Sequence, residues 1–129
     1  MTKAPIWTNG CFDILHVGHL AMLRYAASLG DYLIVGVDTD ERVAISKGPT
    51  RPKNCLQDRM DMLEAIKYVD KVVPFNTDEE LEELIEFYYP KHLVVGADYR
   101  DKRVIGSDHA IQVTFFEKIP GYSTTNIIE

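Results

Sequence analysis

The sequence has few of the features that mark exported, membrane-spanning or nucleic-acid-binding proteins. Its 129 residues include only two cysteines, Cys11 and Cys55, which would allow one disulfide, but we expect reduced thiols and a cytoplasmic protein. No apolar run approaches the ~20 residues that span a bilayer, and residues 1–5 lack the apolar stretch of a signal peptide. The formal net charge of −6 argues against a general nucleic-acid binder, because such proteins need a basic surface.

Internal repeats, low-complexity segments and linkers are also absent from the sequence. Hydrophobic residues make up 46% of the chain and charged residues 26%, which excludes disorder, collagen and coiled coil. A chain of this length can bury a workable core without disulfides or metals. We therefore expect a single globular domain over residues 1–129.

Short apolar runs alternate with helical patterns along the chain. Strands are expected at 6–8, 32–37, 72–75, 92–96 and 112–116, and helices at 18–29, 56–67 and 77–89. Pro74 indicates a strand end or a sheet edge. The alternation predicts an α/β fold, a Rossmann-like doubly wound sheet of about five parallel strands with helices on both faces. Such sheets bind ligands at the carboxyl ends of the strands, where the strand order reverses.

Local signals predict where the helices begin and end. Gly30 follows the first helix as a C-terminal stop in the left-handed conformation. Asn54 with Gln57, and Thr77 with Glu80, have the spacing of capping boxes. The stretches 46–53 and 99–107 are expected to be loops, where α/β proteins usually place their chemistry.

The loop after the first strand carries two histidines. Gly10 lets backbone approach a ligand closely because it has no Cβ. Gly18 lies near the start of the next helix, whose unpaired N–H groups and dipole favour phosphate. His16 and His19 are three residues apart, so both rings fit on one face of the first helical turn. This combination predicts a polyphosphate site.

Other interpretations of this loop stay open. A His pair at this spacing can bind a metal, although no third ligand lies close by in the sequence, and two surface histidines without a role would give the same pattern. The dinucleotide fingerprint G-x-G-x-x-G is absent. Phe12 is expected in the core, and Asp13 either braces the loop or acts as a base.

The segment 10–19, Gly-Cys-Phe-Asp-Ile-Leu-His-Val-Gly-His, resembles the first signature of the cytidylyltransferase-like nucleotidyltransferases. Its centre is their HxGH motif, here residues 16–19. A similar motif occurs in class I aminoacyl-tRNA synthetases, but those enzymes are far longer than this chain. The flanking Gly-x-Phe-Asp makes the resemblance to the nucleotidyltransferases specific.

A basic segment follows the second expected strand. Residues 42–53 include four basic side chains and no acidic one, which suits the steering of anions. A solvated basic loop is the alternative. The resemblance implies that Lys47 contacts a triphosphate, with Arg51 a weaker candidate for the same task.

Arg59 lies in the helix expected at 56–67. The segment Leu-Gln-Asp-Arg-Met at 56–60 resembles the family segment whose Arg faces the active site, where it would hold the triphosphate or the acceptor phosphate. The alternative from the local sequence is a helix-surface Arg59 paired with Asp58 or Glu64.

Two further segments match the family in order along the chain. Gly96-Ala97-Asp98-Tyr99 resembles the stretch that holds base and ribose, although these residue types are also common in turns. The segment 121–127 resembles the second signature, where the hydroxyls of Ser123, Thr124 and Thr125 would bind phosphate at a helix start. Ser123 as a plain N-cap fits equally well. In glycerol-3-phosphate cytidylyltransferases an Arg begins this signature, whereas residues 118–121 of this chain offer only Lys118 there. A lysine cannot make the two parallel hydrogen bonds of an arginine, so it would replace the Arg only in part.

The resemblance implies an enzyme that transfers a nucleoside monophosphate from ATP or CTP to a small sugar or polyol phosphate and releases pyrophosphate. The match is nearest to heptose-1-phosphate adenylyltransferase domains of ADP-heptose synthases, with glycerol-3-phosphate cytidylyltransferase as the alternative and a non-catalytic nucleotide-binding module as a further one. It also implies Mg²⁺ bound with the triphosphate and a homodimer. No metal-ligating residues are expected, and the net charge and the lack of long apolar runs predict no nucleic-acid or membrane partner.

The residues expected at the site fall into two groups. His16, His19 and Lys47 are the expected catalytic residues. The expected nucleotide-binding residues are Asn9, Gly10, Cys11, Phe12, Asp13, Gly18, Arg59, Gly96, Asp98, Tyr99, Ser123, Thr124 and Thr125.

Overall fold

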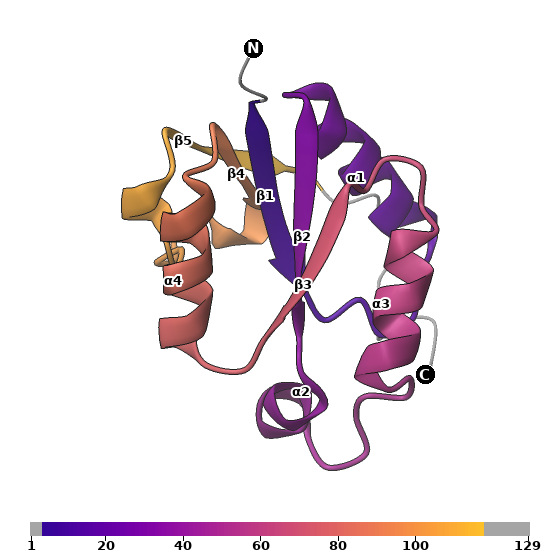
Figure 1. The fold of residues 1–129 in the computed structure, drawn as a ribbon. Helices are drawn as coiled ribbons and strands as arrows, with labels where there is room; N and C mark the ends of the chain where they lie inside the picture. The colour runs from indigo at the N-terminus through magenta and orange to yellow at the C-terminus, as the bar shows by residue number, and fades with distance from the viewer. Residues whose placement is uncertain (1–3, 118–129) are drawn as a thin grey trace.

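A computed structural model describes residues 4–117 and contains a five-stranded parallel sheet (Figure 1). The strands are β1 (Pro5–Gly10), β2 (Tyr32–Asp38), β3 (Lys71–Phe75), β4 (His92–Gly96) and β5 (Gln112–Phe116). Their order in the sheet is β3-β2-β1-β4-β5, and each pairs with its neighbours in parallel. The chain order therefore reverses beside β1, and the predicted parallel sheet is confirmed.

Four helices and two short 3₁₀ helices connect the strands. They are α1 (Val17–Ser28), α2 (Asp40–Lys47), α3 (Leu56–Glu64), α4 (Asp78–Tyr88), η1 (Ala97–Tyr99) and η2 (Ser107–His109). In Figure 1, α1 and α3 cover one face of the sheet and α4 covers the other. Helices thus lie on both faces, as the alternating sequence pattern predicts.

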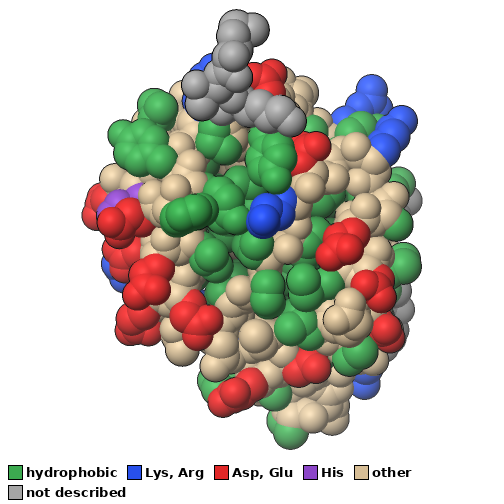
Figure 2. All heavy atoms as spheres, viewed as in Figure 1, with side chains coloured by type: hydrophobic (Ala, Val, Ile, Leu, Met, Phe, Trp, Pro, Cys, Tyr) green, Lys and Arg blue, Asp and Glu red, His purple; other side chains and the backbone are tan. Residues whose placement is uncertain are grey.

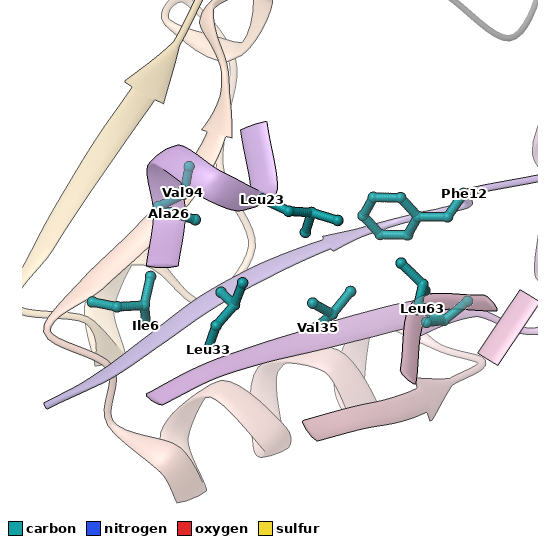
Figure 3. Close-up of a cluster of buried hydrophobic side chains, with 9 residues drawn as sticks. Ile6, Phe12, Leu23, Ala26, Leu33, Val35, Leu63 and Val94 are labelled. Carbon is teal, nitrogen blue, oxygen red and sulfur yellow. The ribbon is translucent and has the colours of Figure 1, made fainter. Parts of the chain in front are cut away.

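Alternating residues of the central strands supply two separate cores, because successive strand side chains point to opposite faces. On the α1 and α3 face, Ile6, Leu33 and Val35 pack with Leu23 and Leu63 (Figure 3). On the α4 face, the buried cluster consists of Trp7, Ile34, Phe75, Leu81, Ile85 and Leu93. Burial on both faces explains why β2 is apolar at nearly every position.

The helix α2 was not predicted, since the sequence analysis placed no helix before the expected loop at 46–53. Thr39 caps its N-terminus by accepting a hydrogen bond from the Arg42 N–H, and Gly48 ends it with a φ of 105°. Only Val43 of its eight residues is buried. A helix with one buried residue shows no apolar periodicity, so the hydrophobic pattern could not reveal it.

Two predicted helix-end signals were wrong in detail. Gly30 has no positive φ; instead, a Cβ there would lie 2.5 Å from the Ala4 carbonyl oxygen, so close backbone packing explains the glycine. The N-cap of α3 is Cys55 rather than Asn54, because both amide groups of Asn54 donate to Asp13. Pro74 does lie on an edge strand, β3, as predicted.

Two observations bear on the environment of the chain. Cys11 and Cys55 are both free thiols, the first partly buried and the second exposed. Within residues 4–117, each helix is too short or too polar to cross a bilayer.

Candidate active site

A cleft of about 640 Å³ opens at the carboxyl ends of the central strands. Residues of β1, β2 and β4 form its floor, and α2 and the segment after β4 form its walls. The lining residues include Asn9, Gly10, Cys11, Asp38, Arg42, Ser46, Lys47, Gly96, Tyr99 and Arg103. The cleft lies where the strand order reverses, which is where ligands of such sheets bind.

The two histidines of the predicted polyphosphate site close the first turn of α1. The Nδ1 atom of His16, the N-cap residue, accepts a hydrogen bond of 3.1 Å from the Gly18 N–H. The Nδ1 atom of His19 accepts a hydrogen bond of 3.1 Å from the His16 N–H. The rings stack with their centroids 3.9 Å apart, so the structure confirms that both lie on one face of the turn.

These caps fix how each imidazole holds its proton. A ring nitrogen that accepts from a backbone N–H carries no hydrogen, so a neutral ring must carry it on Nε2. Burial lowers the pKa of His16, which favours the neutral ring at neutral pH. Both Nε2 atoms are therefore set as hydrogen-bond donors at a helix N-terminus, the arrangement that suits phosphate oxygens.

Packing connects the histidine pair to the cleft. The His19 ring lies against the Phe12 ring, with centroids 5.5 Å apart, and a Cβ on Gly10 would lie 3.3 Å from the Phe12 ring. His19 also shares a helix face with Met22, three residues on, and Met22 lines the cleft. The imidazoles therefore lie at the α1 end of the cleft.

Of the four basic residues of 42–53, Lys53 is exposed, and the other three have contacts or positions that bear on the site. Arg42 is paired with Asp78 at 2.8 Å and Arg51 with Asp13 at 2.9 Å, so the fold uses both charges internally. Lys47 ends α2 and lines the cleft. Burial raises the pKa of the Cys11 thiol and of the Asp38 carboxyl, and the positive charge of Lys47 partly offsets this rise. Both groups line the same cleft. The segment is thus more than a solvated loop.

Arg59 lies behind the floor of the cleft rather than in its wall. The residue is 1% exposed, and four of its five N–H donors bind the protein. The acceptors are the backbone carbonyls of Cys11, Asp38 and Asn54 and the carboxylate of Asp40, at 2.7–3.0 Å. This corrects both expectations: Arg59 is no surface residue paired with Asp58 or Glu64, and its donors hold three separate segments of the chain together rather than a phosphate.

Asp13 also acts as a brace, as one of its two interpretations proposed. Its carboxylate accepts hydrogen bonds from the N–H groups of Lys53 and Asn54 and from Nε of Arg51. Burial alone would raise the pKa of Asp13, but these donors outweigh it and lower the pKa below its ordinary value. With a side chain that is 0% exposed, Asp13 cannot reach a nucleotide in the cleft.

The lowered pKa of Asp13 makes an acid-dependent stability prediction. Its stabilisation is present above the unfolded pKa of about 3.9 and is lost as pH falls through the lower folded pKa. We expect Asp13→Asn to destabilise the protein by about 3 kcal/mol at pH 7, with the difference from the wild type shrinking in acid. Thermal unfolding between pH 3 and 7 measures this. Asp58→Asn, an exposed carboxylate, is the control, and a pH-independent difference would contradict the prediction.

The structure brings some predicted site residues together and separates others. The cleft is lined by Asn9, Gly10, Cys11, Lys47, Gly96 and Tyr99. His16, Gly18 and His19 do not line it but lie in the adjoining first turn of α1, three to six residues before the lining residue Met22. Phe12, Asp13 and Arg59 support the floor from behind, and the expected place of Phe12 in the core is confirmed. Asp98 lies in η1. Ser123, Thr124, Thr125 and the basic Lys118 lie outside the described residues.

Three charged residues that line the cleft, Asp38, Arg42 and Arg103, are not among the predicted site residues. Asp38 ends β2, so its position at the carboxyl end of a strand was the available signal. Arg42 was counted only as one charge of a basic segment. Arg103 lies in the loop expected at 99–107 and carried no motif. The Cys11 thiol was expected at the site, and burial raises its pKa, so it is protonated at neutral pH.

The histidines do not belong to a metal cluster in the part of the chain that the structure describes. No group of three or more His, Cys, Asp or Glu side chains there is arranged to hold a metal ion. The arrangement is instead a helix N-terminus with two imidazole donors, a lysine and a glycine-floored cleft. This fold and site define an α/β domain with a cleft at the carboxyl ends of its parallel strands.

Comparison with known proteins gives the family. The cytidylyltransferase-like family model matches residues 7–129, so the chain belongs to this family. The lipopolysaccharide core biosynthesis protein from Thermoplasma volcanium GSS1 has the same fold, with a TM-score of 0.71 over 92% of this chain and 98% of that one. Their sequence identity is 23%, so this likeness concerns the fold alone.

Curated relatives match along nearly the whole chain. The bifunctional protein HldE of Campylobacter fetus subsp. fetus (strain 82-40) is 47% identical over 126 residues, which cover 98% of this chain and 27% of the relative. HldE of Helicobacter hepaticus (strain ATCC 51449 / 3B1) is 48% identical over 124 residues, 96% of this chain and 26% of the relative. The chain therefore spans about a quarter of the length of these proteins.

Proposed function

We propose that the chain is a nucleotidyltransferase that moves a nucleoside monophosphate from a triphosphate to a small sugar or polyol phosphate. The stacked imidazole pair in the first turn of α1, beside a cleft that Lys47 lines, is the observation that carries this proposal. The proposed type is a heptose-1-phosphate adenylyltransferase, supported by 47–48% identity to proteins named HldE. ATP and a sugar 1-phosphate are the proposed substrates.

In the proposed reaction an oxygen of the acceptor phosphate attacks the α-phosphorus of the triphosphate. The bond from the α-phosphorus to the bridging oxygen breaks, and pyrophosphate leaves with the electron pair. A phosphate monoester is largely ionised near neutral pH, so no general base is required. The protein positions both phosphates and neutralises the charge that develops between them.

Each group near the cleft has a part in this proposal. His16 and His19 donate hydrogen bonds to oxygens of the α- and β-phosphates, and Lys47 holds phosphate from the opposite wall. Gly10 and Gly96 let the nucleotide lie close to the backbone. Mg²⁺ arrives as part of the triphosphate substrate and keeps several of its waters. Ser123, Thr124 and Thr125 remain proposed phosphate ligands.

The homodimer and the cytoplasmic location also belong to the proposal. The edge strand β3 offers one surface for a dimer, because hydrophobic side chains gather on this face of the molecule (Figure 2). Val72 and Val73 of this strand are only half-buried. Free Cys11 and Cys55 and a triphosphate substrate agree with a reducing compartment.

A pyrophosphate-release assay tests the function. ATP and CTP are each combined with heptose 1-phosphate and with glycerol 3-phosphate, with Mg²⁺ present. We expect release with ATP and heptose 1-phosphate. Activity with CTP and glycerol 3-phosphate alone would replace the proposed branch by glycerol-3-phosphate cytidylyltransferase. Nucleotide binding without release under all four conditions would favour a non-catalytic module.

A further inference from the structure

Asp38 is the one acidic side chain that lines the cleft among the described residues. It ends β2, beside the floor residue Cys11, and its side chain is 18% exposed. Lys47, Arg42 and Arg103 line the same cleft. A carboxylate would weaken phosphate binding there by repulsion, so its presence requires another explanation.

The carboxylate of Asp38 accepts no hydrogen bond from any residue of 4–117. Its nearest cationic atom is Nε of Arg42, at 3.9 Å, which is beyond hydrogen-bond distance. The terminal nitrogens of Arg42 bind the Asn76 carbonyl and Asp78 instead. Burial raises the pKa of Asp38 because its solvation has been partly lost. The carboxylate therefore lies partly buried near cationic side chains, and its oxygens keep the capacity to accept hydrogen bonds.

The two walls of the cleft differ in chemistry. The wall after β4 is mainly uncharged, with Tyr99, Val104 and Ile105, and Arg103 is its charged member. This wall suits the flat face of a base. The wall formed by α2 is polar, with Arg42, Ser46 and Lys47, and it adjoins Asp38 at the end of β2. A lysine and a carboxylate on this side of the cleft suit a molecule that carries both a phosphate and hydroxyl groups.

We propose that Asp38 is a specificity residue that accepts a hydrogen bond from a hydroxyl group of the phosphorylated acceptor, while Lys47 binds its phosphate. The inference rests on the proposed function and names the acceptor class as a polyhydroxylated phosphate monoester. An acceptor without the hydroxyl leaves Asp38 unpaired in the closed complex. A site with a buried acceptor group rejects such analogues strongly, which gives selection among phosphate monoesters.

Asp38→Ala tests the proposal, with Asp38→Asn as the conservative variant. We expect Asp38→Ala to raise the KM for heptose 1-phosphate about 10- to 100-fold, since a hydrogen bond to a charged group is lost. Asp38→Asn should give a smaller increase. The KM for ATP should stay unchanged or fall, because a negative charge has left the cleft. Glu41→Ala on the exposed side of α2 makes the same charge change and should alter neither KM.

Deoxy analogues of the acceptor identify the contact. The wild type should discriminate against the analogue that lacks the contacted hydroxyl, and Asp38→Ala should treat that analogue and the natural acceptor alike. A raised KM for ATP with an unchanged acceptor KM would assign Asp38 to the ribose and overturn the proposal. An increased Mg²⁺ requirement would assign it to the metal, with the same consequence. Circular dichroism checks that each variant is folded.

The failure of the proposed function is distinguishable from the failure of this inference. If the wild type releases no pyrophosphate with any acceptor, the proposed function fails. Calorimetric titration of heptose 1-phosphate and glycerol 3-phosphate into the wild type and Asp38→Ala then tests the acceptor contact directly. If the wild type is active and Asp38→Ala keeps its acceptor KM, the inference about Asp38 fails alone.

Discussion

Replacing His16 by Asn, or His19 by Gln, is expected to lower kcat about 10²–10³-fold while the protein stays folded. The two substitutions preserve the helix start. Asn at the N-cap still accepts the Gly18 N–H, and Gln at the third helical position still accepts the His16 N–H, as in a capping box. What each variant lacks is the imidazole Nε2–H that we assign to the phosphates.

The measurement is steady-state pyrophosphate release, with thermal unfolding recorded for each variant. His109→Gln is the matched control, because His109 lies in η2 against Glu82 and does not line the cleft. Its kcat should equal that of the wild type. A His16→Asn or His19→Gln variant with near-normal turnover would remove that imidazole from the mechanism, and a large fall in unfolding temperature would show that capping dominates.

Replacing Arg59 by Lys is expected to give the largest loss of stability, about 3–5 kcal/mol, or roughly 10 °C or more in Tm. One ammonium group cannot reach carbonyls of three separate segments, and each carbonyl left unpaired in the interior costs free energy. The Asp40 carboxylate is half-exposed, so most of the expected loss of stability comes from the three backbone carbonyls.

Urea unfolding of Arg59→Lys measures the loss, with the exposed Arg24→Lys on α1 as the control. Arg24→Lys should change the free energy of unfolding by less than about 0.5 kcal/mol. Activity measured well below the unfolding temperature should also fall, because Arg59 holds the loop of Cys11 and the start of α2 together. Equal stability of Arg59→Lys and the wild type would contradict its assignment as a clamp.

The sheet could be predicted from the sequence because buried parallel strands carry their own signal. Residues 92–96 and 112–116 form strands within the bounds expected for them, and 32–37 is extended by one residue. The helix α2 carries no such signal, since it packs only through Val43. Its polar end signals, Thr39 and Gly48, are equally typical of loops.

The candidate site could be predicted only in part, for a related reason. The spacing of His16 and His19 is local, so the pairing of the rings follows from helix geometry. The partners of Arg59 lie 5, 21 and 48 residues away in the sequence, and backbone carbonyls leave no trace in residue identity. The proposed role of Asp38 could not be predicted either. It depends on Arg42 donating its hydrogen bonds to Asn76 and Asp78 instead of Asp38, which residue identity does not reveal.

Each imidazole at the start of α1 has two roles, since its Nδ1 atom caps the helix and its Nε2 atom is the proposed phosphate donor. The proposed catalysis therefore depends on an intact first turn. A proton on Nδ1 of His16 displaces the Gly18 N–H. Protonation of this ring therefore removes the hydrogen bond that caps the helix and loosens its first turn. Burial lowers the pKa of His16 in the folded chain, so the intact turn persists above the unfolded pKa and weakens as acidity increases beyond it. Acid inactivation and fraying of this turn should consequently proceed as a single event.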